Sequence, residues 1–93
     1  LWDHLMDTLQ NKGYQQITSL SSATLLSVPS GSTLAVIEAE SQAVRWRDDG
    51  TNPTASVGHV LNPGDVYVYR GNLGGIKFIE VTTSAKLSVS YYA

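Results

Sequence analysis

The chain opens with apolar residues spaced as on one side of a helix. In LWDHLMDTLQNKG the apolar positions recur at helical intervals and are separated by polar residues. The stripe consists of Leu1, Trp2, Leu5, Met6 and Leu9. Gly13 then acts as a helix stop, which predicts an N-terminal helix or arm over residues 1–13. Because so short a helix is marginal alone, it has to dock on its own domain or on a neighbouring molecule.

After Gly13 the apolar residues alternate with polar ones, and Thr, Ser, Val, Ile and Tyr dominate, as is typical of strands. Turn-forming clusters such as VPSGS and LNPGD separate the alternating segments. Many short strands with such turns predict an all-β fold, a single antiparallel β-sandwich over residues 14–93 that is jelly-roll-like and has seven to eight strands. The predicted strands cover residues 15–20, 24–28, 33–40, 43–48, 58–61, 65–70, 76–82 and 86–92.

Two hairpins can be predicted residue by residue. A turn at residues 41–42 would place Ile37 opposite Trp46 and Glu38 opposite Arg45, with matching character in each pair. A turn through residues 82–85 would similarly join the strands on either side of it. The remaining predicted pairs are Ala39 with Val44, Phe78 with Val89, and Ile76 with Tyr91. The core residues predicted in this way are Ile37, Val44, Trp46, Phe78 and Val89.

The same alternation accounts for the arginines of RWR. A strand sends successive side chains to opposite faces, so Trp46 points inward while Arg45 and Arg47 point outward. Arginines on an exposed sheet face most often meet carboxylates, here Glu38. The alternative is that they contact a partner protein, because arginine is enriched at interfaces.

Candidate chemistry is sparse elsewhere. In DDGTN, Asp48 and Asp49 offer oxygen ligands, but the ligand spacing and distal glutamate of a calcium loop are absent, so a turn is favoured over a metal site. The histidines, His4 and His59, stand without a partnered nucleophile, and the glycine clusters lack the lysine of a phosphate loop. We expect no enzymatic activity, no metal and no cofactor.

Tyrosines offer one rival function. Tyr67 and Tyr69 share a predicted strand face, and Tyr91 and Tyr92 end the chain, so a row of exposed rings could stack on sugars. The alternative is that these tyrosines bridge core and solvent, which we favour because no acid or amide cluster converges on the rings. A glycan remains an alternative ligand.

Charge and composition narrow the range of partners. Six Lys and Arg against eight Asp and Glu give a net charge of -2, which argues against nucleic-acid binding. The apolar runs are far shorter than a membrane span, so we expect a soluble protein without a membrane partner. With 93 residues in one domain, contacts with other subunits would add useful burial, and a homo-oligomer is expected.

The segments VRWRDDGTNPTASVG, LNPGDVYVYRGNLGGIKFIE and AKLSVSYYA resemble a family of small proteins encoded by tailed bacteriophages and prophages. The resemblance covers roughly residues 17–92 and leaves the first thirteen residues outside it. It implies a virion component, assembled in the host cytoplasm, with a compact β-sandwich.

Three virion functions fit that setting: a capsid decoration (cement) protein, a tail or fibre accessory protein, and a glycan-binding receptor module. We favour decoration, with the major capsid protein as partner, because many copies of a small domain can each add a modest stabilising contact. The predicted partner interface consists of Leu1, Trp2, Leu5, Met6, Leu9, Arg45, Arg47, Asp48 and Asp49.

Overall fold

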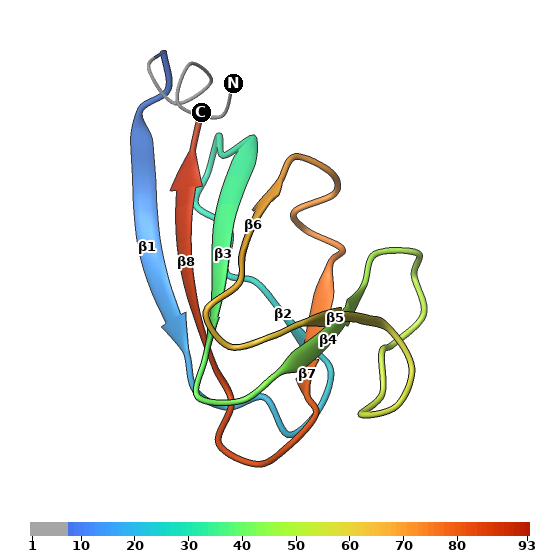
Figure 1. The fold of residues 1–93 in the computed structure, drawn as a ribbon. Helices are drawn as coiled ribbons and strands as arrows, with labels where there is room; N and C mark the ends of the chain where they lie inside the picture. Colours follow the sequence, from blue (N-terminus) through green and yellow to red (C-terminus); the bar gives the residue numbers. More distant parts are fainter. Residues whose placement is uncertain (1–7) are drawn as a thin grey trace.

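The computed structural model describes residues 8–93, which fold into two four-stranded antiparallel sheets stacked as layers (Figure 1). The all-β prediction is therefore confirmed for these residues. The strands are β1 (Asn11–Ile17), β2 (Thr24–Leu25), β3 (Leu34–Glu40), β4 (Val44–Arg47), β5 (His59–Leu61), β6 (Val66–Tyr69), β7 (Lys77–Glu80) and β8 (Lys86–Tyr92).

Seven of the strands lie inside their predicted ranges, but β1 begins at Asn11, so the predicted helix end at Gly13 is wrong. The residues of the predicted arm that precede Thr8 lie outside the described residues. Tertiary pairing overrides the local helix-stop signal, because Gln10 and Ala93 exchange two backbone hydrogen bonds and β1 then runs along β8. No helix in residues 8–93 is long and apolar enough to cross a membrane.

The topology is that of a ribbon folded back at the β4–β5 connection. The first strand pairs with the last, the second with the seventh, the third with the sixth and the fourth with the fifth. The folded ribbon is rolled so that β8 also pairs with β3 and β7 also pairs with β4. The resulting sheet orders are β1-β8-β3-β6 and β2-β7-β4-β5.

Both predicted hairpins are wrong, because β3 and β4 lie in different sheets, as do β7 and β8. Trp46 pairs with Phe78 and His59 instead of with Ile37. The short connections cross from one layer to the other, and each contains a serine in a left-handed backbone conformation, Ser41 at φ 71° and Ser84 at φ 77°.

The inward-facing residues are nevertheless mostly as predicted, because the two-residue period determines the face of each side chain whatever the partner strand is. Four of the five predicted core residues are fully buried: Ile37, Val44, Phe78 and Val89. Trp46 is only partly buried and packs against the core from β4. The two layers thus enclose one core, and Trp46 lies at its margin.

Because each sheet has a buried face and an exposed face, replacing a side chain by alanine should destabilise the protein on the buried face and have little effect on the exposed face. Ile37→Ala should destabilise the fold by about 2–5 kcal/mol, because Ile37 is fully buried between the sheets. Val66→Ala, at a position that is 55% exposed, should change the free energy of unfolding by less than about 0.5 kcal/mol. Urea denaturation of both variants measures the difference, and equal effects would contradict the two-layer arrangement.

Candidate functional site

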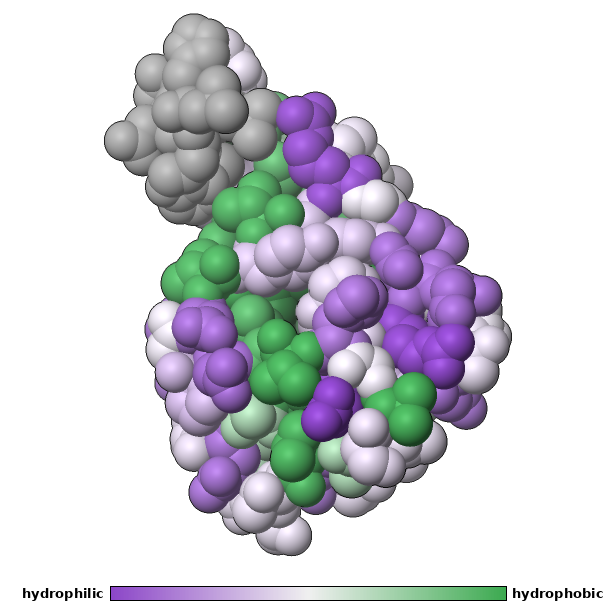
Figure 2. All heavy atoms as spheres, turned by 45° about the vertical axis from the view of Figure 1, so that its right-hand side comes forward, coloured by the Kyte–Doolittle hydropathy of each residue, from purple (hydrophilic) through white to green (hydrophobic). Residues whose placement is uncertain are grey.

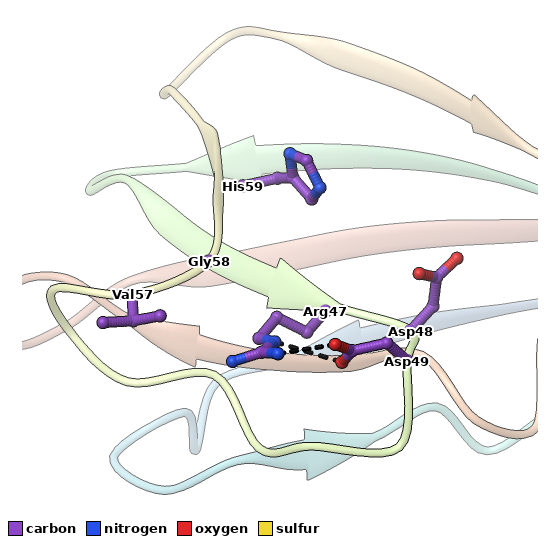
Figure 3. Close-up of a pocket in the computed structure, with 6 residues that line it drawn as sticks. All are labelled: Arg47, Asp48, Asp49, Val57, Gly58 and His59. Carbon is purple, nitrogen blue, oxygen red and sulfur yellow. Dashed lines mark hydrogen bonds and ion pairs between the residues drawn. The ribbon is translucent and has the colours of Figure 1, made fainter.

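The connection between β4 and β5 flares open into a pocket of about 410 Å³ (Figure 3). Its lining consists of Arg47, Asp48, Asp49, Val57, Gly58 and His59. Figure 3 shows Asp48 and His59 on one side of β4, and Arg47 and Asp49 on the other. Strand alternation produces this division, because neighbouring residues of β4 and its continuation point to opposite faces.

Arg45, on the outward face of β4, holds the β4–β5 connection in place through two hydrogen bonds. Its Nε donates to the carbonyl oxygen of Ala55 at 3.2 Å, and its Nη1 donates to the carbonyl oxygen of Gly58 at 2.8 Å. The predicted pairing of Arg45 with Glu38 is wrong, because Glu38 belongs to the other sheet. The predicted outward direction of Arg45 and Arg47 agrees with the structure, but Arg45 serves the loop and does not line the pocket.

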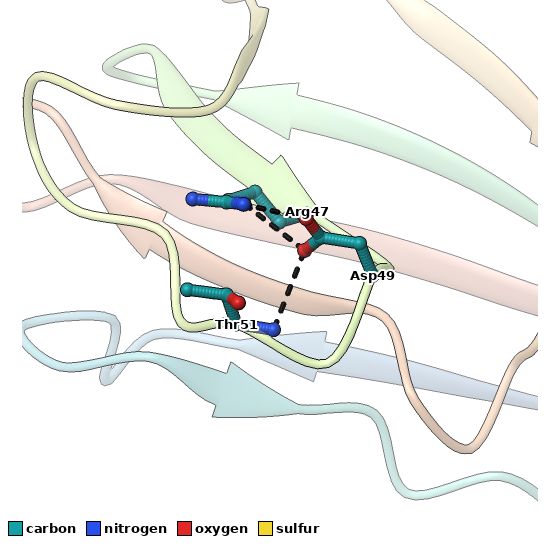
Figure 4. A network of polar contacts seen from close by, with 3 residues as sticks. All are labelled: Arg47, Asp49 and Thr51. Carbon is teal, nitrogen blue, oxygen red and sulfur yellow. Dashed lines mark hydrogen bonds and ion pairs between the residues drawn. The ribbon is translucent and has the colours of Figure 1, made fainter.

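Arg47 and Asp49 form the one ion pair found among residues 8–93 (Figure 4). The pair is bidentate, with Nε and Nη2 of Arg47 donating to the two carboxylate oxygens. The backbone N–H of Thr51 adds a hydrogen bond of 3.3 Å to Asp49. Hydrogen bonding within the pair raises the pKa of Arg47 and lowers that of Asp49. Because Asp49 is exposed and Arg47 partly exposed, water weakens the attraction between them, and the pair mainly orders the start of the loop.

Further contacts fix the rest of the connection. Pro53 is fully buried, and Lys77 Nζ donates to Asn52 Oδ1 at 2.7 Å. Gly58 closes the connection with φ +140°, where an added Cβ would lie 3.1 Å from the carbonyl oxygen of Trp46. The loop is therefore held rigidly, as is typical of loops that present a binding surface on a fixed scaffold.

An aromatic cluster lies next to the pocket and covers the margin of the core there. Trp46 of β4 stacks on Tyr67 of β6 with ring centroids 5.3 Å apart, and His59 of β5 lies 4.6 Å from the indole. The cluster spans both sheets, since β6 belongs to the first and β4 and β5 to the second. The alternative of a row of exposed tyrosines, which we do not favour, does not hold, because Tyr69 is 5% exposed and Tyr91 is fully buried.

Asp48 is tied to this cluster by Tyr69. The phenol of Tyr69 donates to Asp48 Oδ2 at 2.7 Å and accepts a hydrogen bond of 2.9 Å from the backbone N–H of Asn72. Burial, and then the bond to Asp48, raises the pKa of Tyr69 to about 12. Asp48 and Asp49 thus face different partners, and residues 8–93 contain no group of three or more potential metal-binding side chains.

The structure brings together part of the predicted interface. Arg47, Asp48 and Asp49 line one pocket, whereas Leu9, the only stripe residue that is described, is half-buried just before β1. Leu1, Trp2, Leu5 and Met6 lie outside the described residues. His59 was missed as a site residue, because its position depends on the pairing of β5 with β4, which periodicity does not reveal. The chain matches no model of a known protein family, no curated protein and no solved structure.

The glycines of the loop provide a matched test of its rigidity. Gly58→Ala should destabilise the protein by about 3 kcal/mol, because the new Cβ would meet backbone and side-chain atoms at a backbone angle that favours glycine. Gly50→Ala, where φ is +87° and nothing lies within 4 Å, should cost only about 1 kcal/mol. Thermal unfolding of the two variants gives the comparison, and equal losses would mean that the loop is not closely packed at Gly58.

Alkaline titration tests the bond between Tyr69 and Asp48. Burial raises the pKa of Tyr91, and burial with Asp48 raises that of Tyr69, in both cases from 10.0 to about 12. The folded state therefore retains these protons, and the associated stability should be present below pH 10 and lost as the pH rises to about 12. Asp48→Asn should lower the pKa of Tyr69, as followed by ultraviolet absorbance with Tyr69→Phe to assign the signal. An unchanged titration curve would exclude the coupling.

Proposed function

We propose that this chain is a non-enzymatic structural protein of a phage virion, a capsid decoration (cement) protein that stabilises the shell through protein–protein contacts. The proposal includes the fold: the two sheets form a jelly roll. The observation that carries it is the strand order, in which a folded ribbon of eight strands is rolled into the sheets β1-β8-β3-β6 and β2-β7-β4-β5. Eight-stranded double-sheet jelly rolls recur in viral capsid proteins.

The chemistry of the pocket supports a binding role over a catalytic one. The charged groups of Arg47 and Asp49 neutralise each other, and the guanidinium of Arg45 is committed to two backbone carbonyls. His59, the one histidine among the described residues, packs against Trp46 with the two ring planes tilted by 34°. These groups order a surface, and the residues that line the pocket include no hydroxyl or thiol nucleophile for His59 to activate.

The surface supports assembly into a larger particle. Figure 2 shows apolar residues gathered in a band on one side of the molecule, with hydrophilic residues beside it. Val57, Val60 and Val66 are each about half exposed, and the last two lie on the edge strands β5 and β6. Large exposed apolar areas on a small domain mark contact surfaces. Both further copies of the chain and the major capsid protein are partners in this proposal.

One end of the sandwich gathers several candidate contact segments. Gln10 and Ala93 are hydrogen-bonded, so Leu9, the one described residue of the apolar stripe, lies next to the C-terminal end of β8. The β2–β3 connection lies there too, since an added Cβ at Gly13 would be 3.1 Å from Pro29. We expect this end, with the stripe of Leu1, Trp2, Leu5, Met6 and Leu9, to face the partner.

Deleting residues 1–9 tests the stripe. The deletion stops before Gln10 and leaves every strand pair in place, so the melting temperature should be unchanged while binding to particles that lack the protein is lost. Thr82→Ala, at an exposed position in the β7–β8 connection, serves as a control that should retain binding. Quantitative mass spectrometry of purified virions tests the location, because a shell protein should be present in hundreds of copies and a tail protein in about a dozen or fewer. Retained binding by the deletion would refute the stripe as contact, and a low copy number would refute decoration.

A further inference from the structure

The pocket at the β4–β5 connection carries an unbalanced negative charge. Arg47 and Asp49 neutralise each other in a bidentate pair, whereas Asp48 has only a neutral donor, Tyr69. No lysine or arginine among residues 8–93 forms an ion pair with Asp48. Among the lining residues Arg47 contributes one positive charge and Asp48 and Asp49 two negative charges, so a cation brought beside Asp48 would gain a favourable interaction.

Asp48 is also held in position before any ligand arrives. Tyr69 donates to Oδ2 at 2.7 Å, and Tyr69 itself is 5% exposed and fixed by the backbone N–H of Asn72. A carboxylate oriented through one oxygen presents the other, Oδ1, with its lone pairs available to an incoming donor. Such preorganisation lowers the entropy lost when a ligand binds.

The other walls suit an aliphatic cation. The ring of His59 lines the pocket and is backed by Trp46 at 4.6 Å, which in turn stacks on Tyr67. A planar guanidinium stacks on aromatic rings, and the indole of Trp46 behind His59 is the ring type that attracts cations most strongly. Val57, which is 51% exposed, offers an apolar wall for the methylene stem of a long basic side chain.

Other ligand classes fit the pocket less well. A sugar would need an open aromatic face with several converging polar groups, but Trp46 already packs against His59 and Tyr67, and Arg47 is occupied by Asp49. A calcium ion would need several oxygens directed at one point, whereas Asp48 and Asp49 face different partners.

We propose that this pocket receives an arginine or lysine side chain of the partner protein, with Asp48 as its counter-ion and the His59 ring as its platform. The inference rests on the proposed function, because it supplies the chemistry of one contact that the chain would make with its neighbour. It predicts that the partner presents a basic side chain opposite the β4–β5 loop.

Nuclear magnetic resonance of the full chain tests the site without the partner. Titration with N-acetyl-arginine amide should shift the backbone amide signals of residues 57–59, and N-acetyl-glutamine amide should not. Asp48→Asn should weaken the arginine response about threefold to tenfold, whereas Glu38→Gln, which removes an exposed charge from the other sheet, should leave it unchanged. Equal affinity of the wild type and Asp48→Asn would overturn the inference, as would shifts caused by methyl glucoside in place of the arginine compound.

Particle binding separates this inference from the proposed function. If the wild type and Asp48→Asn bind particles equally well, the basic-side-chain site is wrong while decoration stands. If the arginine compound binds at residues 57–59 but the wild type does not bind particles, decoration is wrong while the site stands. Should Asp48→Asn fold poorly, the comparison of the arginine and glutamine compounds on the wild type still decides the question.

Discussion

The pairing of the first strand with the last is the constraint on which the rest of the molecule depends. It places β8 between β1 and β3 and brings Gln10 to Ala93, so the two ends of the described residues lie side by side. The same folding back makes the β4–β5 connection the point at which the ribbon reverses. The β4–β5 connection joins neighbouring strands of one sheet and does not cross between the layers. It spans residues 48–58, and residues at its two ends line the pocket.

Strand positions could be predicted from the sequence, but strand partners could not. The two-residue period determines which side chains face inward, so Ile37 and Val89 were correctly assigned to the core. The period is the same in every strand, however, and it cannot distinguish a neighbour in the chain from a distant segment. The connections at Ser41 and Ser84 read as hairpin turns, although both carry the chain from one sheet to the other.

The candidate site was only partly visible for a related reason. Arg47, Asp48 and Asp49 stand together in the sequence and were recognised as one surface. The role of Arg45 in holding the loop could not be predicted, because it donates to backbone carbonyl oxygens, and every residue has one whatever its side chain. The bond between Tyr69 and Asp48 joins two sheets and follows from the tertiary fold alone. His59 belongs to the site because β5 pairs with β4 and places it opposite Trp46, and the sequence does not reveal that pairing.

The central place of β8 also bears on how the protein is made. Because β8 follows the other seven strands in the chain and lies in the middle of one sheet, neither that sheet nor the core beneath it can be completed before residues 86–92 have left the ribosome. Until then β1 and β3 have no strand between them, so a chain that lacked β8 would lose the pairing that holds both strands in one sheet.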